Sequence, residues 1–146
     1  MKTERRGSRW GERGQALAEF ALIMPVLFLC IAGIIEFGRG WNIKQAVTDA
    51  AREGARYSVI DHSPEYTIGE VKAKVRARLA LAGISTTNPP TTITISDELN
   101  WHKVGAEITM QVSTKYRMGW VGALLGWAGG SSTVIISSKA TMRNEK

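Results

Sequence analysis

The most constraining feature of the sequence is an uncharged apolar run, Phe20 to Ile35, which follows a basic tail. A helix of roughly 17 to 25 mostly apolar residues spans a bilayer, so Gly14 to Gly38 is long enough if the lone carboxylate of Glu19 lies near the membrane surface. A soluble-core helix would instead need apolar packing on every face, and a 146-residue chain has little else to wrap around one. We therefore predict a single membrane-spanning helix.

The distribution of charge predicts the orientation of this span. Residues 1–14 hold five basic side chains against two acidic ones, which is half of the net charge of +6. Lysine and arginine beside a membrane span stay on the cytoplasmic side. We therefore expect a cytoplasmic tail and an extracytoplasmic C-terminal part in a single-pass protein of a bacterial cytoplasmic membrane. We interpret the basic excess as a topology signal, with no nucleic-acid partner.

The tail does not read as an ordinary secretory signal peptide, in which a small-residue cleavage site follows the apolar region. Here the small residue, Gly14, precedes that region, and no Ala-x-Ala pattern follows it. Ordinary signal removal is therefore not expected. The plain alternative is an uncleaved signal anchor in which Gly14 is a linker residue.

Three sequence blocks carry a family resemblance: Arg13–Pro25 (RGQALAEFALIMP), Gly33–Arg39 (GIIEFGR) and Ala50–Tyr57 (AAREGARY). In this order, with a span between them, they resemble the TadE-like family, the pilin-like proteins of the tight-adherence (Tad) pilus machinery. Ala140–Glu145 adds weaker support. Within the first block, a glycine followed by four residues and then a glutamate resembles a type IV prepilin processing site.

The resemblance implies that a prepilin peptidase cuts between Gly14 and Gln15, which makes Glu19 the fifth residue of the mature chain. Glu19 would then meet the new α-amine of its own chain or of a neighbour and set subunit register. A carboxylate inside the membrane costs about a few kcal/mol on insertion scales, so it tends to be functional or paired. The simpler alternative places Glu19 at the level of the lipid headgroups.

Pro25 lies inside the predicted span, where it removes a backbone hydrogen bond and predicts a kink or local melting. The resemblance suggests that it helps the segment to leave the bilayer for a filament, and a simple kink is an equal alternative. Beyond the span, Glu36 and Arg39 are three residues apart and can pair at the outer boundary. The helix is expected to continue, so Ala16 to Ile60 would form one rod of roughly 65 Å.

Small residues recur every four positions in the second half of this rod and predict a helix-packing seam. The partner of the seam is either the chain's own outer domain, which we favour, or another subunit. The seam consists of Ala46, Ala50, Gly54 and Ser58.

The outer part of the chain predicts a small α+β domain. Apolar residues spaced three and four apart, Ile68, Val71, Val75 and Leu79, predict an amphipathic helix over Thr67–Ala82. Alternating segments predict three strands of an antiparallel sheet, at Thr91–Ser96, Val104–Tyr116 and Ser132–Met142. The expected organisation is a basic leader (1–14), a transmembrane and extended pilin-like helix (15–60) and an extracytoplasmic α+β domain (61–146).

An apolar, glycine-rich segment, Met118–Gly130, separates the second and third predicted strands. It is too short for a second span. We expect it to fold back and cap the core. If it were exposed instead, it would form a patch for a partner, made by Trp120, Leu124, Leu125 and Trp127.

No nucleotide loop, metal-ligand spacing or nucleophile elbow is found in the sequence, and His62 and His102 are isolated. We therefore expect neither an enzyme nor a cofactor. By resemblance, the protein would be a pseudopilin or minor pilin acting in assembly of an adhesive Tad-type pilus. Its expected partners are a prepilin peptidase, other pilin-like subunits, the pilus assembly platform and the membrane. The alternative is an uncleaved, membrane-anchored extracytoplasmic binding module.

Overall fold

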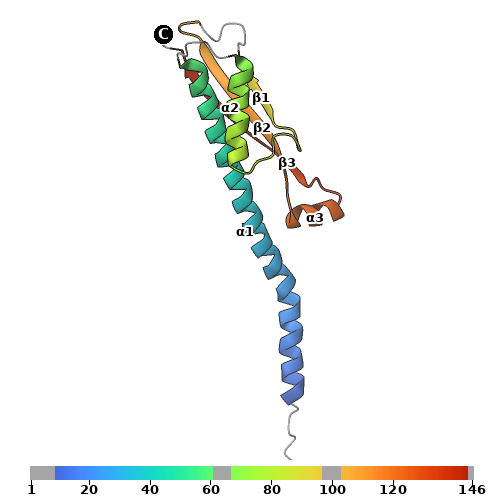
Figure 1. Ribbon diagram of the computed structural model, residues 1–146. Coiled ribbons are helices and arrows are strands. Elements are labelled where there is room, and N and C mark those ends of the chain that lie inside the picture. Colours follow the sequence, from blue (N-terminus) through green and yellow to red (C-terminus); the bar gives the residue numbers. More distant parts are fainter. Residues whose placement is uncertain (1–8, 61–66, 97–102, 145–146) are drawn as a thin grey trace, which may run out of the picture.

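The computed structural model describes residues 9–60, 67–96 and 103–144, and shows a long helix with a small domain packed on one end of it (Figure 1). This is the α+β fold that the sequence predicts. In chain order the elements are α1 (Arg9–Val59), α2 (Ile68–Leu81), β1 (Thr92–Ile95), β2 (Glu107–Arg117), α3 (Trp120–Trp127) and β3 (Thr133–Arg143).

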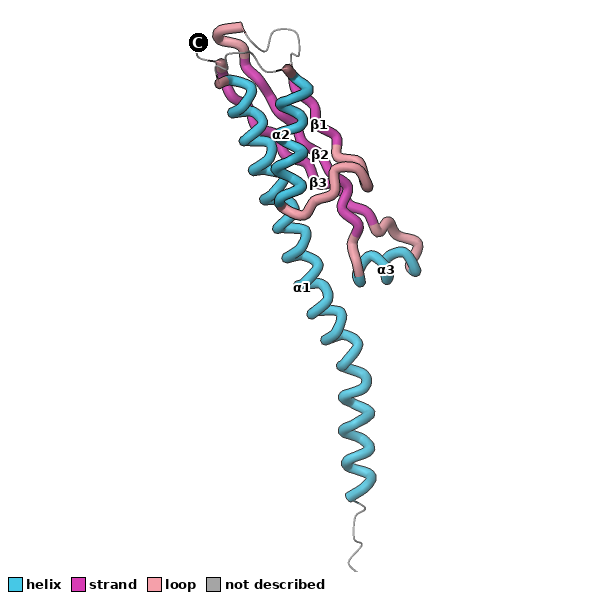
Figure 2. Tube along the Cα trace, viewed as in Figure 1, coloured by secondary structure: helices cyan, strands magenta, loops and turns pink. Residues whose placement is uncertain are grey.

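Helix α1 is a single element of 51 residues, about 77 Å long at 1.5 Å per residue. It begins at Arg9, earlier than the predicted Ala16, so the helix runs through Gly14 and Gln15. The helix also continues through Pro25, so the proline causes no local melting here. Figure 2 shows one continuous, gently curved helix, which is how long helices commonly accommodate such a residue.

The sheet is antiparallel with the order β1-β2-β3. The central strand β2 pairs Met110 with Ile95 on one side and Ile108 with Met142 on the other. Side chains alternate between the two faces of a strand, so Ile108, Met110 and Val112 share one buried face. The opposite face carries polar residues such as Thr109, whose hydroxyl lies 2.8 Å from that of Thr141.

The core lies between this buried sheet face and two helices, α2 and the C-terminal half of α1. Val71, Val75 and Leu79 of α2 are buried, as their spacing predicted. Of the predicted seam on α1, Ala50, Gly54 and Ser58 are buried and Ala46 is half-buried. The partner of the seam is the chain's own domain.

Gly54 explains why this seam needs small residues. A Cβ atom at this position would lie 2.5 Å from Cγ2 of Val75 and 3.0 Å from Cε of Met110. The glycine therefore lets α2 and β2 approach α1 at the same point. A helix built of larger residues could not be covered on this face by both elements.

Helix α2 begins with a capping box. The backbone N–H of Glu70 donates to Oγ1 of Thr67 at 3.3 Å, and the backbone N–H of Thr67 donates to Oε2 of Glu70 at 2.7 Å. Two otherwise unpaired donors at the helix start are thereby satisfied. These bonds lower the pKa of the Glu70 carboxyl below its ordinary value, because they favour its ionised form.

Candidate functional site

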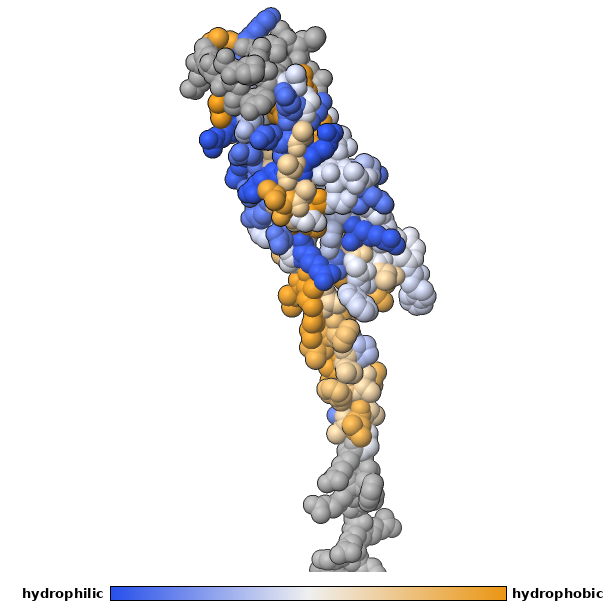
Figure 3. Space-filling view, in the orientation of Figure 1, coloured by the Kyte–Doolittle hydropathy of each residue, from blue (hydrophilic) through white to orange (hydrophobic). Residues whose placement is uncertain are grey.

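The N-terminal half of α1 exposes a surface that the folded domain does not cover. Leu22 is 78% exposed and Phe28 is 66% exposed. Figure 3 shows this half as apolar surface below the more polar domain. The helix is long and apolar enough to cross a membrane, and only 6% of its most apolar 18-residue window is buried. A core helix of a soluble protein would be mostly buried, so that alternative does not describe this segment. We call residues 14–35 the membrane half of α1 and residues 36–59 its domain half.

The predicted processing and assembly residues lie together at the start of this apolar surface. Gly14, Gln15 and Glu19 are all exposed on α1. The side-chain amide of Gln15 donates to Oε1 of Glu19 at 3.0 Å. Positions 15 and 19 are one turn apart on a helix and face the same side. The carboxylate of Glu19 thus bonds to Gln15, the residue that the predicted cleavage would make the N-terminus.

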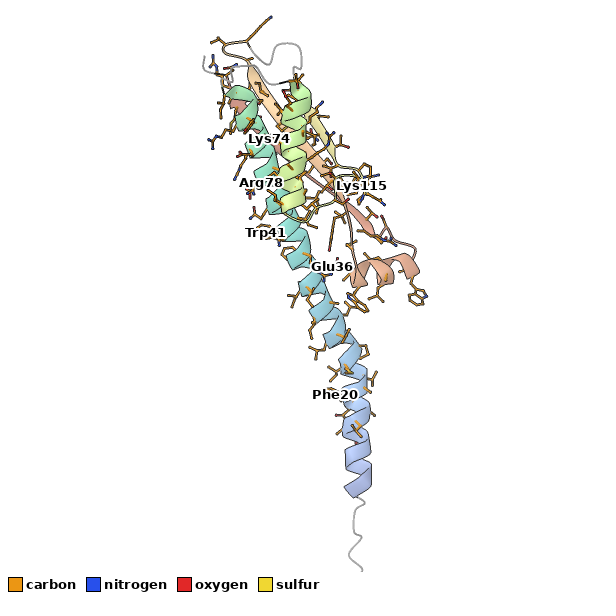
Figure 4. The ribbon with its side chains drawn as sticks, viewed as in Figure 1. Phe20, Glu36, Trp41, Lys74, Arg78 and Lys115 are labelled. Carbon is orange, nitrogen blue, oxygen red and sulfur yellow. The ribbon has the colours of Figure 1, made fainter. Side chains whose placement is uncertain are left out.

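Glu36, at the other end of the apolar run, ties α1 to the outer domain. It is only 6% exposed. Its Oε1 accepts hydrogen bonds from the hydroxyl of Tyr116 and from the backbone N–H of Gly119, the latter at 2.9 Å. Figure 4 places Glu36 on α1 at the level of α3. The predicted pair with Arg39 is thus not the main role of this carboxylate, which turns inward to the end of β2.

The contact with Glu36 changes the chemistry of Tyr116. Burial raises the pKa of its phenol, and the hydrogen bond to Glu36 and the charge of that carboxylate raise it further, to about 12. A phenol beside a carboxylate resists losing its proton, because a second negative charge would face the first. The bond between β2 and α1 therefore persists throughout the ordinary pH range.

The expectation that Met118–Gly130 caps the core is wrong. This segment forms α3, in which Trp120 is 72% exposed and Trp127 is 91% exposed. Leu124 and Leu125 are also exposed. Helices α1 and α2 already cover the apolar face of the sheet, so α3 has no core left to close. It lies beyond the end of the sheet, beside α1 (Figure 1).

Residues 14–56 match the protein-family model described as TadE-like protein. The resemblance to the TadE-like family is confirmed for this segment. No curated protein and no solved structure matches the chain. The match supports a pilin-like protein associated with a Tad pilus.

The family match covers most of α1, from residue 14 to residue 56. It includes Gly14, Glu19 and Pro25 in the exposed half, Glu36 at the boundary, and most of the buried seam as far as Gly54. The patch on α3 lies outside it. The family match therefore covers the apolar helix and its packing seam, but not α3.

Sequence reasoning missed the role of Glu36. The local signal was present, since a carboxylate that ends an apolar run requires a partner or water. Its partners, however, lie 80 and 83 residues further along the chain.

Within residues 9–60, 67–96 and 103–144, no group of three or more His, Cys, Asp or Glu residues could hold a metal ion. His62 and His102 lie outside these ranges.

Proposed function

We propose that the protein is a pseudopilin or minor pilin that acts in the assembly of an adhesive Tad-type pilus. The observation that carries this proposal is the family match over residues 14–56, a range that includes the long apolar part of α1 left uncovered by the domain. In this role α1 anchors the chain in the cytoplasmic membrane, with the basic leader inside the cell and the domain outside. The role is structural rather than catalytic.

Assembly would proceed by packing α1 against the α1 helices of other pilin-like subunits. Large apolar side chains such as Leu22 and Phe28 are exposed, and water is an unfavourable environment for them. Lipid covers them in the membrane, and neighbouring subunits would cover them in a filament. The buried seam takes no part in this exchange, because the chain's own domain occupies it.

Processing by a prepilin peptidase would prepare this surface. Cleavage after Gly14 would create an α-amine at Gln15, one turn from Glu19, where the Gln15 side chain already bonds the carboxylate. In a low-dielectric environment a carboxylate and an ammonium group attract each other strongly. An amine donated by a neighbouring subunit would fix the axial register between the two helices.

The first test is the amino-terminal sequence of the membrane-extracted protein, with and without a coexpressed prepilin peptidase. We expect a start at Gln15 only when the peptidase is present. A start at Met1 in both samples would contradict the processing step. It would favour the alternative of an uncleaved, membrane-anchored binding module, for which the exposure of Trp127 is the supporting observation.

The second test separates the role of Glu19 from that of a surface charge. Glu19→Ala should insert and be cleaved, but should be lost from the sheared pilus fraction or from crosslinks to other pilin-like subunits. Glu53→Ala is the matched control, since Glu53 is an exposed carboxylate on the domain half of the same helix. Assembly of Glu19→Ala at the wild-type level would refute a role in register.

A further inference from the structure

The tip of the domain that faces the membrane half of α1 carries no charge. Between Arg117 and Lys139 there is no Asp, Glu, Lys or Arg, a stretch that includes all of α3 and the start of β3. Trp120 and Trp127 are largely exposed there, and so is Ile135 of β3. An exposed apolar patch of this kind marks a surface that binds something.

The position of α3 along α1 indicates its depth relative to the membrane span. An apolar groove of about 730 Å³ lies between the two helices, and its lining includes Phe28, Leu29, Ala32, Trp120 and Leu124. Phe28 precedes Glu36 by eight residues, or about 12 Å along the helix. Residues that share a groove with Phe28 therefore lie below the end of the apolar run, at the depth of the span.

The backbone of α3 suits a medium without water. At its start the N–H of Gly119 donates to Glu36. At its end Ala128 donates to Leu124 and Gly130 donates to Leu125, with Gly129 in the left-handed conformation at a φ of 79°. Unpaired backbone groups are costly in lipid, and these bonds satisfy groups at both ends of the helix.

We propose that α3 inserts into the membrane leaflet on the side of the folded domain, with lipid acyl chains filling its groove with α1. Tryptophan favours the boundary between lipid and water, and the binding of a helix there strengthens with the apolar area that it buries. Glu36 holds the start of α3 at this boundary through Tyr116 and Gly119. The domain is thereby fixed against the membrane at a second point besides α1 itself.

The experiment uses the full chain in vesicles of phosphatidylethanolamine and phosphatidylglycerol. Trp127 is kept as the only tryptophan, the other four being replaced by phenylalanine, and its fluorescence is measured with lipids brominated on their acyl chains. Two reference variants with a single tryptophan set the scale. Phe28→Trp reports the span, and Thr94→Trp reports the exposed outer face of the sheet.

We expect Trp127 to emit at short wavelength and to lose emission to brominated lipid nearly as strongly as Phe28→Trp. A second reporter, with Trp120 as the only tryptophan, should behave in the same way. Water-like emission without quenching, as for Thr94→Trp, would overturn the proposal. Short-wavelength emission that brominated lipid does not quench, and that grows with protein density, would overturn it in favour of a second copy of the chain.

This inference rests on the membrane-spanning helix and not on processing or pilus assembly. The vesicle experiment uses the uncleaved chain, so its outcome is independent of where the mature protein begins. A start at Met1 would leave the insertion of α3 intact. Conversely, an α3 in water would leave cleavage after Gly14 untouched.

Discussion

The two halves of α1 belong to one helix but have opposite surroundings. In the domain half, Val47, Ala50 and Ala51 are completely buried by α2 and the sheet. In the membrane half, Leu22 and Phe28 are mostly exposed. The difference follows side-chain size. Small residues let the chain's own elements approach closely, whereas large apolar residues on all sides need lipid or other helices around them.

This contrast separates folding from assembly within a single helix. The domain half contributes to the free energy of unfolding of the outer domain, because its side chains are part of that core. The membrane half contributes little to it, since the domain does not touch most of that surface. Mutations in the domain half should therefore change the stability of the domain, and mutations in the membrane half should change assembly.

The largest expected effect distinguishes a core leucine from a membrane leucine. Leu79→Ala removes a completely buried side chain and should lower the free energy of unfolding of the domain by about 2–5 kcal/mol. Leu22→Ala makes the same chemical change on the exposed half and should leave that free energy within about 0.5 kcal/mol of wild type. Denaturant unfolding in detergent micelles, followed by near-UV circular dichroism, measures both. Equal losses would break the separation of the two halves.

A smaller effect is expected from adding one methyl group to the seam. At Gly54 the new Cβ would lie 2.5 Å from Val75, and overpacking of this kind costs about 1–3 kcal/mol. Val75 and Met110 are both buried and have little room to move, so this cost should exceed the roughly 1 kcal/mol that alanine gains over glycine in a helix. Gly54→Ala should therefore destabilise the domain.

Gly40→Ala is the matched control, because nothing lies within 4 Å of a Cβ at that position. It should leave the domain as stable as wild type or slightly more stable, through helix propensity alone. The same unfolding measurement applies to both variants. A stable Gly54→Ala would mean that α2 and β2 can move away from α1 without loss, and the seam would not be a close contact.

The elements that the sequence predicted are those with a local signal. The 3- and 4-residue spacing of Val71, Val75 and Leu79 predicted α2, and alternation predicted β2 and its buried face. The seam was visible as small residues four apart, whereas its partner was left open between the chain's own domain and another subunit. In each case the chemistry that forms the element lies within one segment of chain.

The features that sequence reasoning missed depend on distant residues or on the space left by others. Glu36 meets Tyr116 only because the end of β2 returns to α1. The exposure of Trp127 depends on α1 and α2 having already filled the place where a cap would sit. A local pattern cannot report either condition, since both arise from the packing of the whole domain.

The third prediction concerns the contact between Glu36 and Tyr116, which ties α1 to the outer domain. Tyr116→Phe removes the hydrogen bond to Glu36 and should weaken the docking of α3 by about 1.5 kcal/mol, because the acceptor is a carboxylate. The pKa of Tyr116 is raised from 10.0 to about 12. A group with a raised folded pKa stabilises the fold fully below its ordinary pKa and loses that contribution as pH rises toward the folded value. The docking of α3 should therefore weaken between pH 10 and pH 12.

Tyrosinate absorbance, followed through a titration of the folded protein, measures the pKa of Tyr116. A step near pH 12 should be present in the wild type and absent in Tyr116→Phe. In Glu36→Gln it should shift to lower pH, because the carboxylate's charge and its strong hydrogen bond are removed. A late step that survives unchanged in Glu36→Gln would show that burial alone holds the proton on Tyr116.

The smallest expected effect on the stability of the domain comes from removing the charge of Glu70. The pKa of Glu70 is lowered by its bonds with Thr67, so its ionised form contributes stability above the ordinary value of 4.5. That contribution is lost as pH falls through the lowered pKa. Glu70→Gln should be slightly less stable than wild type at neutral pH, and the two should converge in acid.

Glu53→Gln removes an exposed charge on α1 as a control and should show no such convergence. A gap between wild type and Glu70→Gln that stays constant down to acid pH would mean that the capping bonds do not require the charge. Helix α2 lies beside the C-terminal part of α1 (Figure 1), so this difference should also be the same in micelles and in vesicles. Agreement between the two would show that the folded domain is stabilised without the membrane.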